Sequence, residues 1–64
     1  MLGNYCDALS YYDESLAIRR EVGDRAGEGA TLNNIGSVYD NQGNYDEALS
    51  YYEESLAIRR EVGD

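Results

Sequence analysis

The feature that most constrains this sequence is a 22-residue segment that occurs twice, with an offset of 40 residues. The copies run over residues 3–24 and 43–64 and differ at three positions. Those positions pair Cys6 with Asp46, Asp7 with Glu47, and Asp13 with Glu53. A period of this length is typical of repeat arrays, in which each unit packs only against its neighbours. The chain therefore holds two copies of one element and one copy of the segment between them.

The repeated segment has the residue spacing of an amphipathic helix. In the second copy the apolar residues recur at helical steps: Tyr45, Ala48, Leu49, Tyr52 and Leu56. Asn44, followed three residues later by Glu47, is typical of a capping box at a helix N-terminus. Gly63 suits the left-handed residue that ends a helix. With Asn4 and Gly23 in the same places of the first copy, the pattern predicts helices at roughly 5–22 and 45–62.

The segment between the copies predicts a helix over residues 25–42. Its apolar stripe follows Asp24, which suits an N-cap, and consists of Leu32, Ile35, Val38 and Tyr39. Gly27 and Gly29 each cost about 1 kcal/mol relative to alanine in a helix, so we expect fraying before residue 30. Gly36, at similar cost in mid-helix, predicts close approach of a neighbouring helix. The fold class is therefore all-α, with three antiparallel helices forming about one and a half helix-turn-helix units.

The set of apolar and glycine residues over 29–64 resembles the tetratricopeptide repeat. The matching residues are Leu32, Ile35, Gly36, Tyr39, Gly43, Tyr45, Ala48, Tyr52, Leu56 and Ile58. The period and the ending AIRREVGD are similar to the longer repeats of kinesin light chains and bacterial arrays. Residues 3–24 match the second helix of a repeat alone. The resemblance implies a superhelical stack of helix pairs that binds proteins or peptides.

Composition excludes several classes of function. The net charge is −8, and all five basic residues are arginine, so a phosphate backbone would be repelled and nucleic acid is not expected as a partner. With no histidine and one cysteine, Cys6, we expect no metal, no cofactor and no catalytic activity. No apolar run has the length of a membrane span and no signal-peptide core follows Met1, so a cytoplasmic chain is expected.

One candidate binding surface lies on the middle helix. The resemblance implies that this helix lines a concave face, and that asparagine at the Asn34 position holds the backbone of a peptide. The polar residues opposite the apolar stripe are Asn33, Asn34, Ser37, Asp40 and Asn41. Amide side chains both donate and accept hydrogen bonds, which suits an extended peptide. The alternative interpretation is a solvated polar face.

A second candidate surface is an apolar stripe on the two long helices. It comprises Tyr11, Ile18, Val22, Tyr51, Ile58 and Val62. One adjacent helix cannot cover both this stripe and the first, and exposed apolar patches mark interaction surfaces. We expect the chain to self-associate and so complete its core, with a two-fold dimer favoured and an exchange of helices through residues 23–29 as one route.

Two other functions compete with this one. The chain could be a peptide-binding groove that functions only within a longer array of repeats. It could also be a redox sensor, because a thiol near a helix N-terminus has a lowered pKa. Nothing basic lies beside Cys6 in the sequence and its counterpart is Asp46, so we expect Cys6 to be inert.

Overall fold

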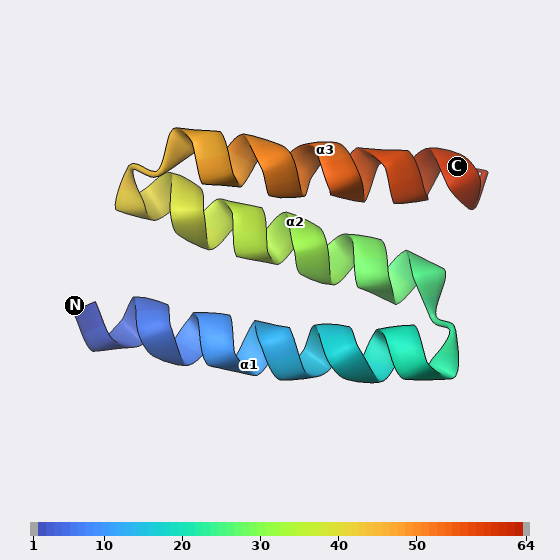
Figure 1. The fold of residues 1–64 in the computed structure, drawn as a ribbon, viewed down its shortest axis with the longest axis horizontal. Coiled ribbons are helices and arrows are strands. Elements are labelled where there is room, and N and C mark those ends of the chain that lie inside the picture. The colour runs from blue at the N-terminus through green and yellow to red at the C-terminus, as the bar shows by residue number, and fades with distance from the viewer. Residues whose placement is uncertain (1, 64) are drawn as a thin grey trace.

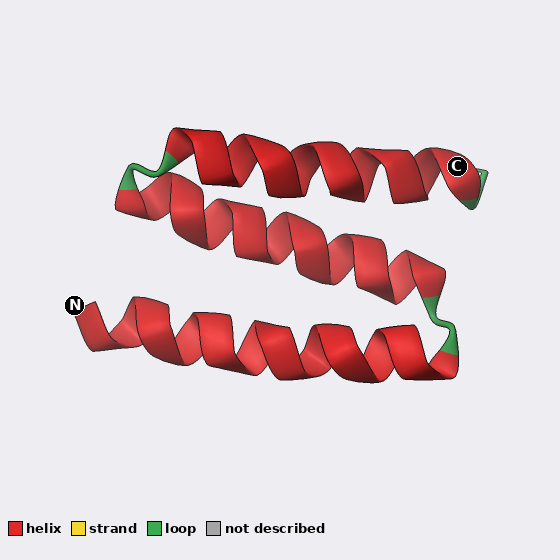
Figure 2. Ribbon diagram, in the orientation of Figure 1, coloured by secondary structure: helices red, strands yellow, loops and turns green. Residues whose placement is uncertain are grey.

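Three helices account for almost all of the chain. The computed structural model describes the backbone of residues 2–63 and the side chains of residues 5–63. Helix α1 spans Leu2–Val22, α2 spans Arg25–Gln42 and α3 spans Tyr45–Glu61. They run antiparallel to their neighbours, with α2 between α1 and α3 (Figure 1), and the described residues outside them form tight turns (Figure 2). The predicted all-α class is confirmed.

Left-handed glycines end the helices, as the sequence pattern predicts. Gly23, Gly43 and Gly63 have φ angles of 77°, 85° and 83°. A side chain at such a φ angle is strained, so glycine is the residue that closes a helix at these places. After Gly43, the N–H of Asn44 donates to the carbonyl of Tyr39 at 2.9 Å, which satisfies an otherwise free carbonyl at the end of α2.

The start of α1 differs from the prediction. The helix begins at Leu2 instead of residue 5, so Asn4 lies inside the helix and not at its N-cap. The equivalent Gly43-Asn44 pair turns because its N–H groups bond to carbonyls of α2. Gly3 and Asn4 lie within α1, so the pair of residues that forms a turn at 43–44 is helical at 3–4.

The predicted capping box at α3 is wrong. Asn44 occupies the N-cap position, but its side chain makes no capping hydrogen bond. Its Nδ2 atom instead donates to Oε1 of Gln42 at 3.3 Å, so the side chain is directed back toward the turn. Helix α3 ends at Glu61, one residue before the predicted end.

Helix α2 is helical from Arg25 onward, including the glycine-containing start at which we expected fraying. Asp24 caps the helix as predicted, because its Oδ1 atom accepts from the N–H of Gly27 at 3.0 Å. The hydroxyl of Thr31 donates to the carbonyl of Gly27 at 2.9 Å. Gly29 is buried with Ile58 directly against it, so packing against α3 offsets the low helix propensity of glycine.

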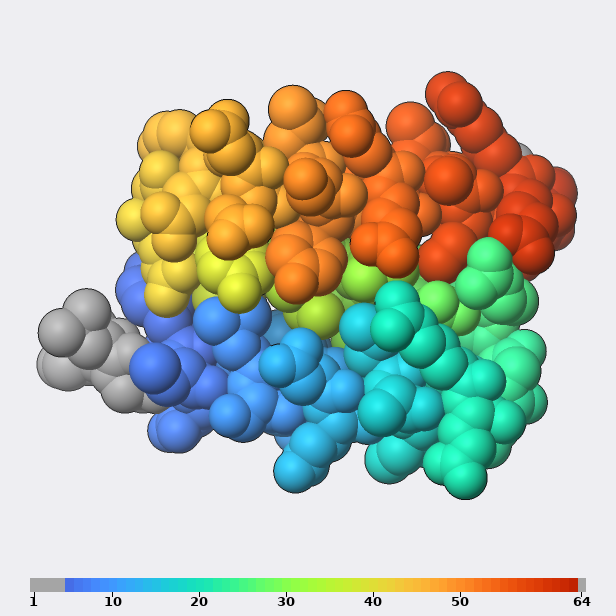
Figure 3. Space-filling model, viewed as in Figure 1, coloured from blue at the N-terminus to red at the C-terminus, as the bar shows by residue number. Residues whose placement is uncertain are grey.

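The core is centred on α2. Buried residues from all three helices form one cluster, which consists of Leu16, Leu32, Ile35 and Ile58. The predicted close approach at Gly36 is confirmed: a Cβ atom there would lie 2.8 Å from Cε1 of Tyr52 and 3.2 Å from the carbonyl oxygen of Ala48. In the space-filling view, α2 shows as a strip between α1 and α3 (Figure 3).

Candidate functional site

The two copies of the repeated segment pack against opposite sides of α2 and therefore bury different positions. Leu16 of α1 is 8% exposed, whereas its counterpart Leu56 in α3 is 46% exposed. The relation reverses at the next apolar position, because Ile18 is 59% exposed and Ile58 only 5%. Each copy thus leaves uncovered the face that the other copy buries.

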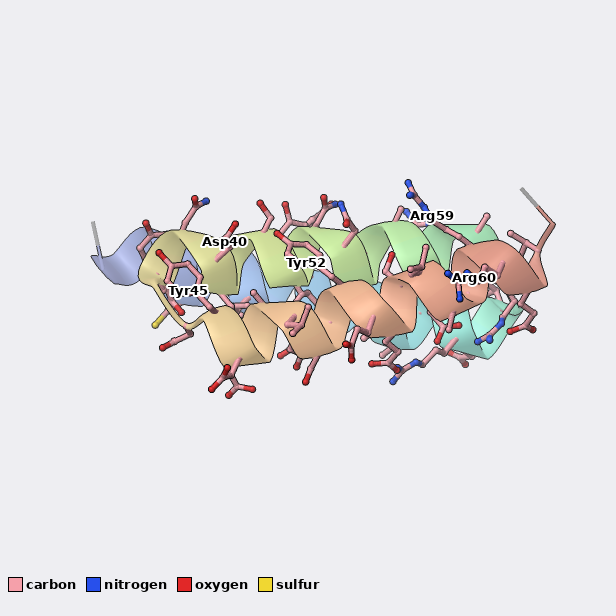
Figure 4. All side chains as sticks on the ribbon, turned by 90° about the horizontal axis from the view of Figure 1, so that it is seen from above. Asp40, Tyr45, Tyr52, Arg59 and Arg60 are labelled. Carbon is pink, nitrogen blue, oxygen red and sulfur yellow. The ribbon has the colours of Figure 1, made fainter. Side chains whose placement is uncertain are left out.

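The first uncovered face lies on the side of α3 that points away from α2. We name it the α3 outer face and define it by Tyr45, Leu49, Leu56 and Arg60, all of which are exposed. The counterparts of the three apolar residues, Tyr5, Leu9 and Leu16, are half-buried or buried. Figure 4 looks down onto this side of α3, and Arg60 lies on the viewer's side of the helix. The same sequence that meets α2 in α1 is therefore open to solvent in α3.

The second uncovered face lies on α1. We name it the α1 outer face and define it by Tyr11, Ile18 and Val22, which are exposed as the sequence analysis expected. Their α3 counterparts Tyr51 and Ile58 are packed against α2. Of the predicted stripe residues in the second copy, only Val62, which directly follows α3, is exposed.

The prediction that Tyr51 and Ile58 belong to a self-association surface is therefore wrong. Ile58 lies in the core against Gly29. The ring of Tyr51 stacks on that of Tyr39, with centroids 5.5 Å apart and planes 8° from parallel. Burial, aided by the nearby Tyr39 and carboxylates that include Asp13, raises the pKa of Tyr51 above its ordinary value. Both residues face inward because α3 uses this stripe, and not the other, to contact α2.

A buried carboxylate connects the three helices. The side chain of Glu28 in α2 is 6% exposed and accepts from Nε of Arg20 at 2.9 Å and from Nη1 of Arg25 at 2.8 Å. These two hydrogen bonds hold the pKa of Glu28 below its ordinary value, with the bond from Arg20 the largest cause. Arg25 also donates to Glu61 of α3, and Arg20 lies 3.6 Å from Glu54.

Sequence reasoning missed Glu28 as a structural residue. The sequence does show that Glu28 lies on the apolar stripe of α2, because it precedes Leu32 by four residues, about one helical turn. An acid at such a position needs a basic partner. The partner Arg20 belongs to a different helix, so the sequence alone does not show the pair.

Arg60 is the α3 counterpart of Arg20, and the two arginines are in different environments. Arg20 bonds the buried Glu28, whereas Arg60 is exposed and has no ion-pair partner within 4.0 Å among the described side chains. The α3 outer face therefore combines uncovered apolar residues with an arginine whose duplicate holds a carboxylate.

The polar side chains of α2 lie on the face where the sequence pattern places them. All five predicted side chains are exposed: Asn33, Asn34, Ser37, Asp40 and Asn41. They lie opposite the buried Leu32 and Ile35, and within the described part of the chain no hydrogen bond joins one of these side chains to another protein group. No pocket is found in the structure, so the described residues offer this face as an open surface.

Cys6 is exposed, and because α1 begins at Leu2 it does not lie at the helix N-terminus. Among the residues that the structure describes, no cluster of three or more potential metal ligands occurs. None of the described helices combines the length and the apolar character needed to cross a membrane.

One comparison with known proteins identifies a family of helix-pair repeats. The profile of the tetratricopeptide repeat matches residues 1–61. Searches of curated proteins and of solved structures return no match. The matched range includes all three helices and nearly the whole chain, so this chain belongs to the tetratricopeptide repeat family.

Proposed function

We propose that the chain is a non-catalytic protein-interaction module that binds through the outer faces of α1 and α3. The observation that carries the proposal is the exchange of burial between the two copies. Residues such as Leu16 and Ile58 are covered by α2, whereas their duplicates Leu56 and Ile18 have the same chemistry and no cover. Membership of a family of interaction modules supports the same conclusion.

Covering the apolar residues of these faces contributes favourable free energy to association. Full burial of a leucine or isoleucine side chain contributes about 1.5–3 kcal/mol. Ile18, Leu49 and Leu56 are each about half exposed, so covering one of them contributes roughly 1 kcal/mol. Several such residues on one face, together with an exposed tyrosine, make a surface that gains free energy when a partner covers it.

We further propose that copies of this chain associate through these faces when no other partner is present. Both outer faces belong to the same helix sequence, which carries acids in its first half and arginines near its end. Two such helices packed antiparallel place acids of one opposite arginines of the other, which favours a two-fold dimer.

Sedimentation velocity over a range of concentrations tests this proposal. Leu56→Asp places a charge on the α3 outer face and should shift the population toward monomer. Ser50→Asp adds the same charge on an exposed polar position of α3 and should leave the distribution close to that of the unchanged chain. A chain that stays monomeric at every concentration, or that responds equally to both substitutions, would contradict self-association through this face.

The polar face of α2 supports a second candidate function, peptide binding within a longer array. Five exposed polar side chains lie together without hydrogen-bond partners in the described residues. For a partner bound at this face, Asn34→Ala should weaken binding and Leu56→Asp should not. The opposite pattern would assign the partner to the α3 outer face.

A further inference from the structure

One side of the molecule brings charged residues of α1 and α3 together over α2. Figure 3 looks onto this side, with α2 as a strip between the other two helices. Arg20 reaches across from α1, because its Nη2 atom lies 3.6 Å from Oε2 of Glu54 in α3. We name this side the α1–α3 face. Its residues are Asp13 and Arg20 of α1, Tyr39 of α2, and Glu47, Tyr51 and Glu54 of α3.

The register of the two helices sets two acids against each other on this face. Helices α1 and α3 are both antiparallel to α2, so they run parallel to one another (Figure 1). Asp13 precedes Arg20 by seven residues, and Glu47 precedes Glu54 by seven. Seven residues make about two helical turns and advance roughly 10 Å along each axis. Asp13 therefore faces Glu47 as Arg20 faces Glu54.

An aromatic pair lies beside these acids. Tyr51 is one turn from both Glu47 and Glu54, and its ring stacks on that of Tyr39 with centroids 5.5 Å apart. Burial is the largest cause of the raised pKa of Tyr51, and the charges of Asp13, Glu47 and Glu54 add to it. These carboxylates therefore surround an aromatic surface, which attracts cations and accepts the aliphatic part of a long basic side chain.

The arginines of the chain neutralise one end of the α1–α3 face and not the other. Arg20 and Arg25 pair with glutamates of α2 and α3 near the C-terminal ends of α1 and α3. Among the described side chains, no base pairs with Asp13 or Glu47, and both acids are exposed. Residues 1–18 and 26–58 contain no arginine, lysine or histidine. The two facing acids therefore have no counter-charge from the neighbouring segments.

We propose that this end of the α1–α3 face binds an arginine side chain of a partner protein. Its guanidinium lies between Asp13 and Glu47, and its aliphatic part lies against Tyr51. The net charge of −8 favours the approach of a basic partner. This surface is separate from the two outer faces and from the polar face of α2, so it goes beyond the proposed function.

Arg20 shows why arginine fits better than lysine. Its guanidinium donates to Glu28 through Nε and lies against Glu54 through Nη2, so one side chain bridges carboxylates of two helices. A planar guanidinium has donors along more than one edge and stacks on aromatic rings, whereas the ammonium of lysine is a compact point charge. Two acids on opposite helices beside a tyrosine ring match the first geometry.

A short peptide provides a defined probe. An acetylated and amidated alanine pentapeptide with one central arginine is titrated into the isotope-labelled chain, and amide and tyrosine ring signals are followed by NMR. We expect the shifts to concentrate at Asp13, Glu47 and Tyr51. The same peptide with citrulline, which has the shape of arginine without its charge, should bind at least about tenfold more weakly. The lysine peptide should bind more weakly than the arginine peptide.

Removal of either acid tests the two contacts separately. Asp13→Asn and Glu47→Gln should each weaken binding of the arginine peptide about threefold, as expected for a partly exposed ion pair. Neither substitution should lower stability, because each relieves a contact between like charges.

The duplicated segment supplies a matched control for each acid. Glu53 is the duplicate of Asp13 and lies two turns before Arg60, on the side of the α3 outer face. Asp7 is the duplicate of Glu47 and lies one turn before Tyr11, on the side of the α1 outer face. Glu53→Gln and Asp7→Asn remove the same charge from the chain and should leave the affinity for the peptide nearly unchanged.

An arginine placed in the chain itself gives a second measurement. In Asp13→Arg the new side chain should pair with Glu47 as Arg20 pairs with Glu54, which raises the urea midpoint of unfolding and abolishes binding of the arginine peptide. Glu53→Arg adds the same charge on the other side of α3 and should do neither.

Three results would overturn the proposal. These are an arginine peptide that does not bind, a citrulline peptide that binds equally well, and equal losses from Asp13→Asn, Glu47→Gln and their two controls, which would indicate general attraction to an acidic chain. Shifts confined to the α3 outer face would also overturn it. None of these results bears on the response of self-association to Leu56→Asp, which tests the proposed function.

Discussion

Ile18 and Ile58 occupy the same position of the duplicated segment, yet Ile18 is 59% exposed and Ile58 is 5% exposed. Ile58 packs against Gly29 on the side of α2 that receives α3. Ile18 is on the side of α1 that no described element covers. The difference comes from which side of α2 each copy contacts, and it makes the two residues matched controls for one another.

Truncation of these two isoleucines should have unequal effects. Ile58→Ala removes buried methyl groups and leaves a cavity, so we expect a loss of about 2–4 kcal/mol in the free energy of unfolding. Ile18→Ala, at an exposed site, should change it by no more than about 0.5 kcal/mol. Urea denaturation followed by circular dichroism measures both, and equal losses would show that α1 and α3 do not pack on opposite sides of α2.

Ser15 and Ser55 occupy the same position of the two copies and provide a second comparison between them. Ser55 donates to the carbonyl of Gly29 at 2.7 Å in a buried position, whereas the structure gives no hydrogen bond for the side chain of its counterpart Ser15. Ser55→Ala should therefore cost about 1 kcal/mol, because the carbonyl of Gly29 loses a partner away from water. Ser15→Ala should be nearly neutral in the same thermal or urea measurement. A neutral Ser55→Ala would mean that this hydrogen bond contributes little to the α2–α3 contact.

Gly36→Ala should destabilise the chain although alanine favours helix. The gain in helix propensity is about 1 kcal/mol, but the added Cβ atom would lie 2.8 Å from the ring of Tyr52, and overpacking of this kind costs about 1–3 kcal/mol. We expect a net loss of about 1 kcal/mol in the free energy of unfolding. In a Tyr52→Leu background the ring is absent, so Gly36→Ala should cost less. A rise in stability of the single variant would contradict close packing at this point.

The stability of the chain should depend on acid pH through Glu28. Its pKa in the folded chain lies below the ordinary value of 4.5, because Arg20 and Arg25 bond the carboxylate. The resulting stabilisation is complete above pH 4.5 and is lost as the pH falls through the lowered folded pKa.

Comparison with Glu28→Gln isolates this carboxylate from other acids. The variant should be less stable than the unchanged chain at pH 7, and the difference should shrink as the pH is lowered below 4.5. Thermal unfolding at several pH values measures the difference directly. A constant difference over the range would show that the charge of Glu28 is not what stabilises the three-helix contact.

Local sequence determined much of this fold. Residues 25–42 and the two copies have helical spacing, and Gly23 and Gly43 end helices because only glycine adopts their φ angles without strain. The apolar stripe at Leu32 and Ile35, and the close approach at Gly36, depend on residues within one helix. These features follow from short-range chemistry, and the sequence predicts them correctly.

Tertiary structure decided the interaction surfaces. Two helices of nearly identical sequence contain the same two apolar stripes, so no pattern within them shows which stripe each one buries. That choice depends on the side of α2 that each helix contacts, and it buries Ile58 while leaving Ile18 and Leu56 uncovered. The burial of Glu28 has the same origin, since its partner Arg20 reaches it from another helix. The sequence alone determined that there are three helices with apolar stripes, and only their packing determined which stripe is available to a partner.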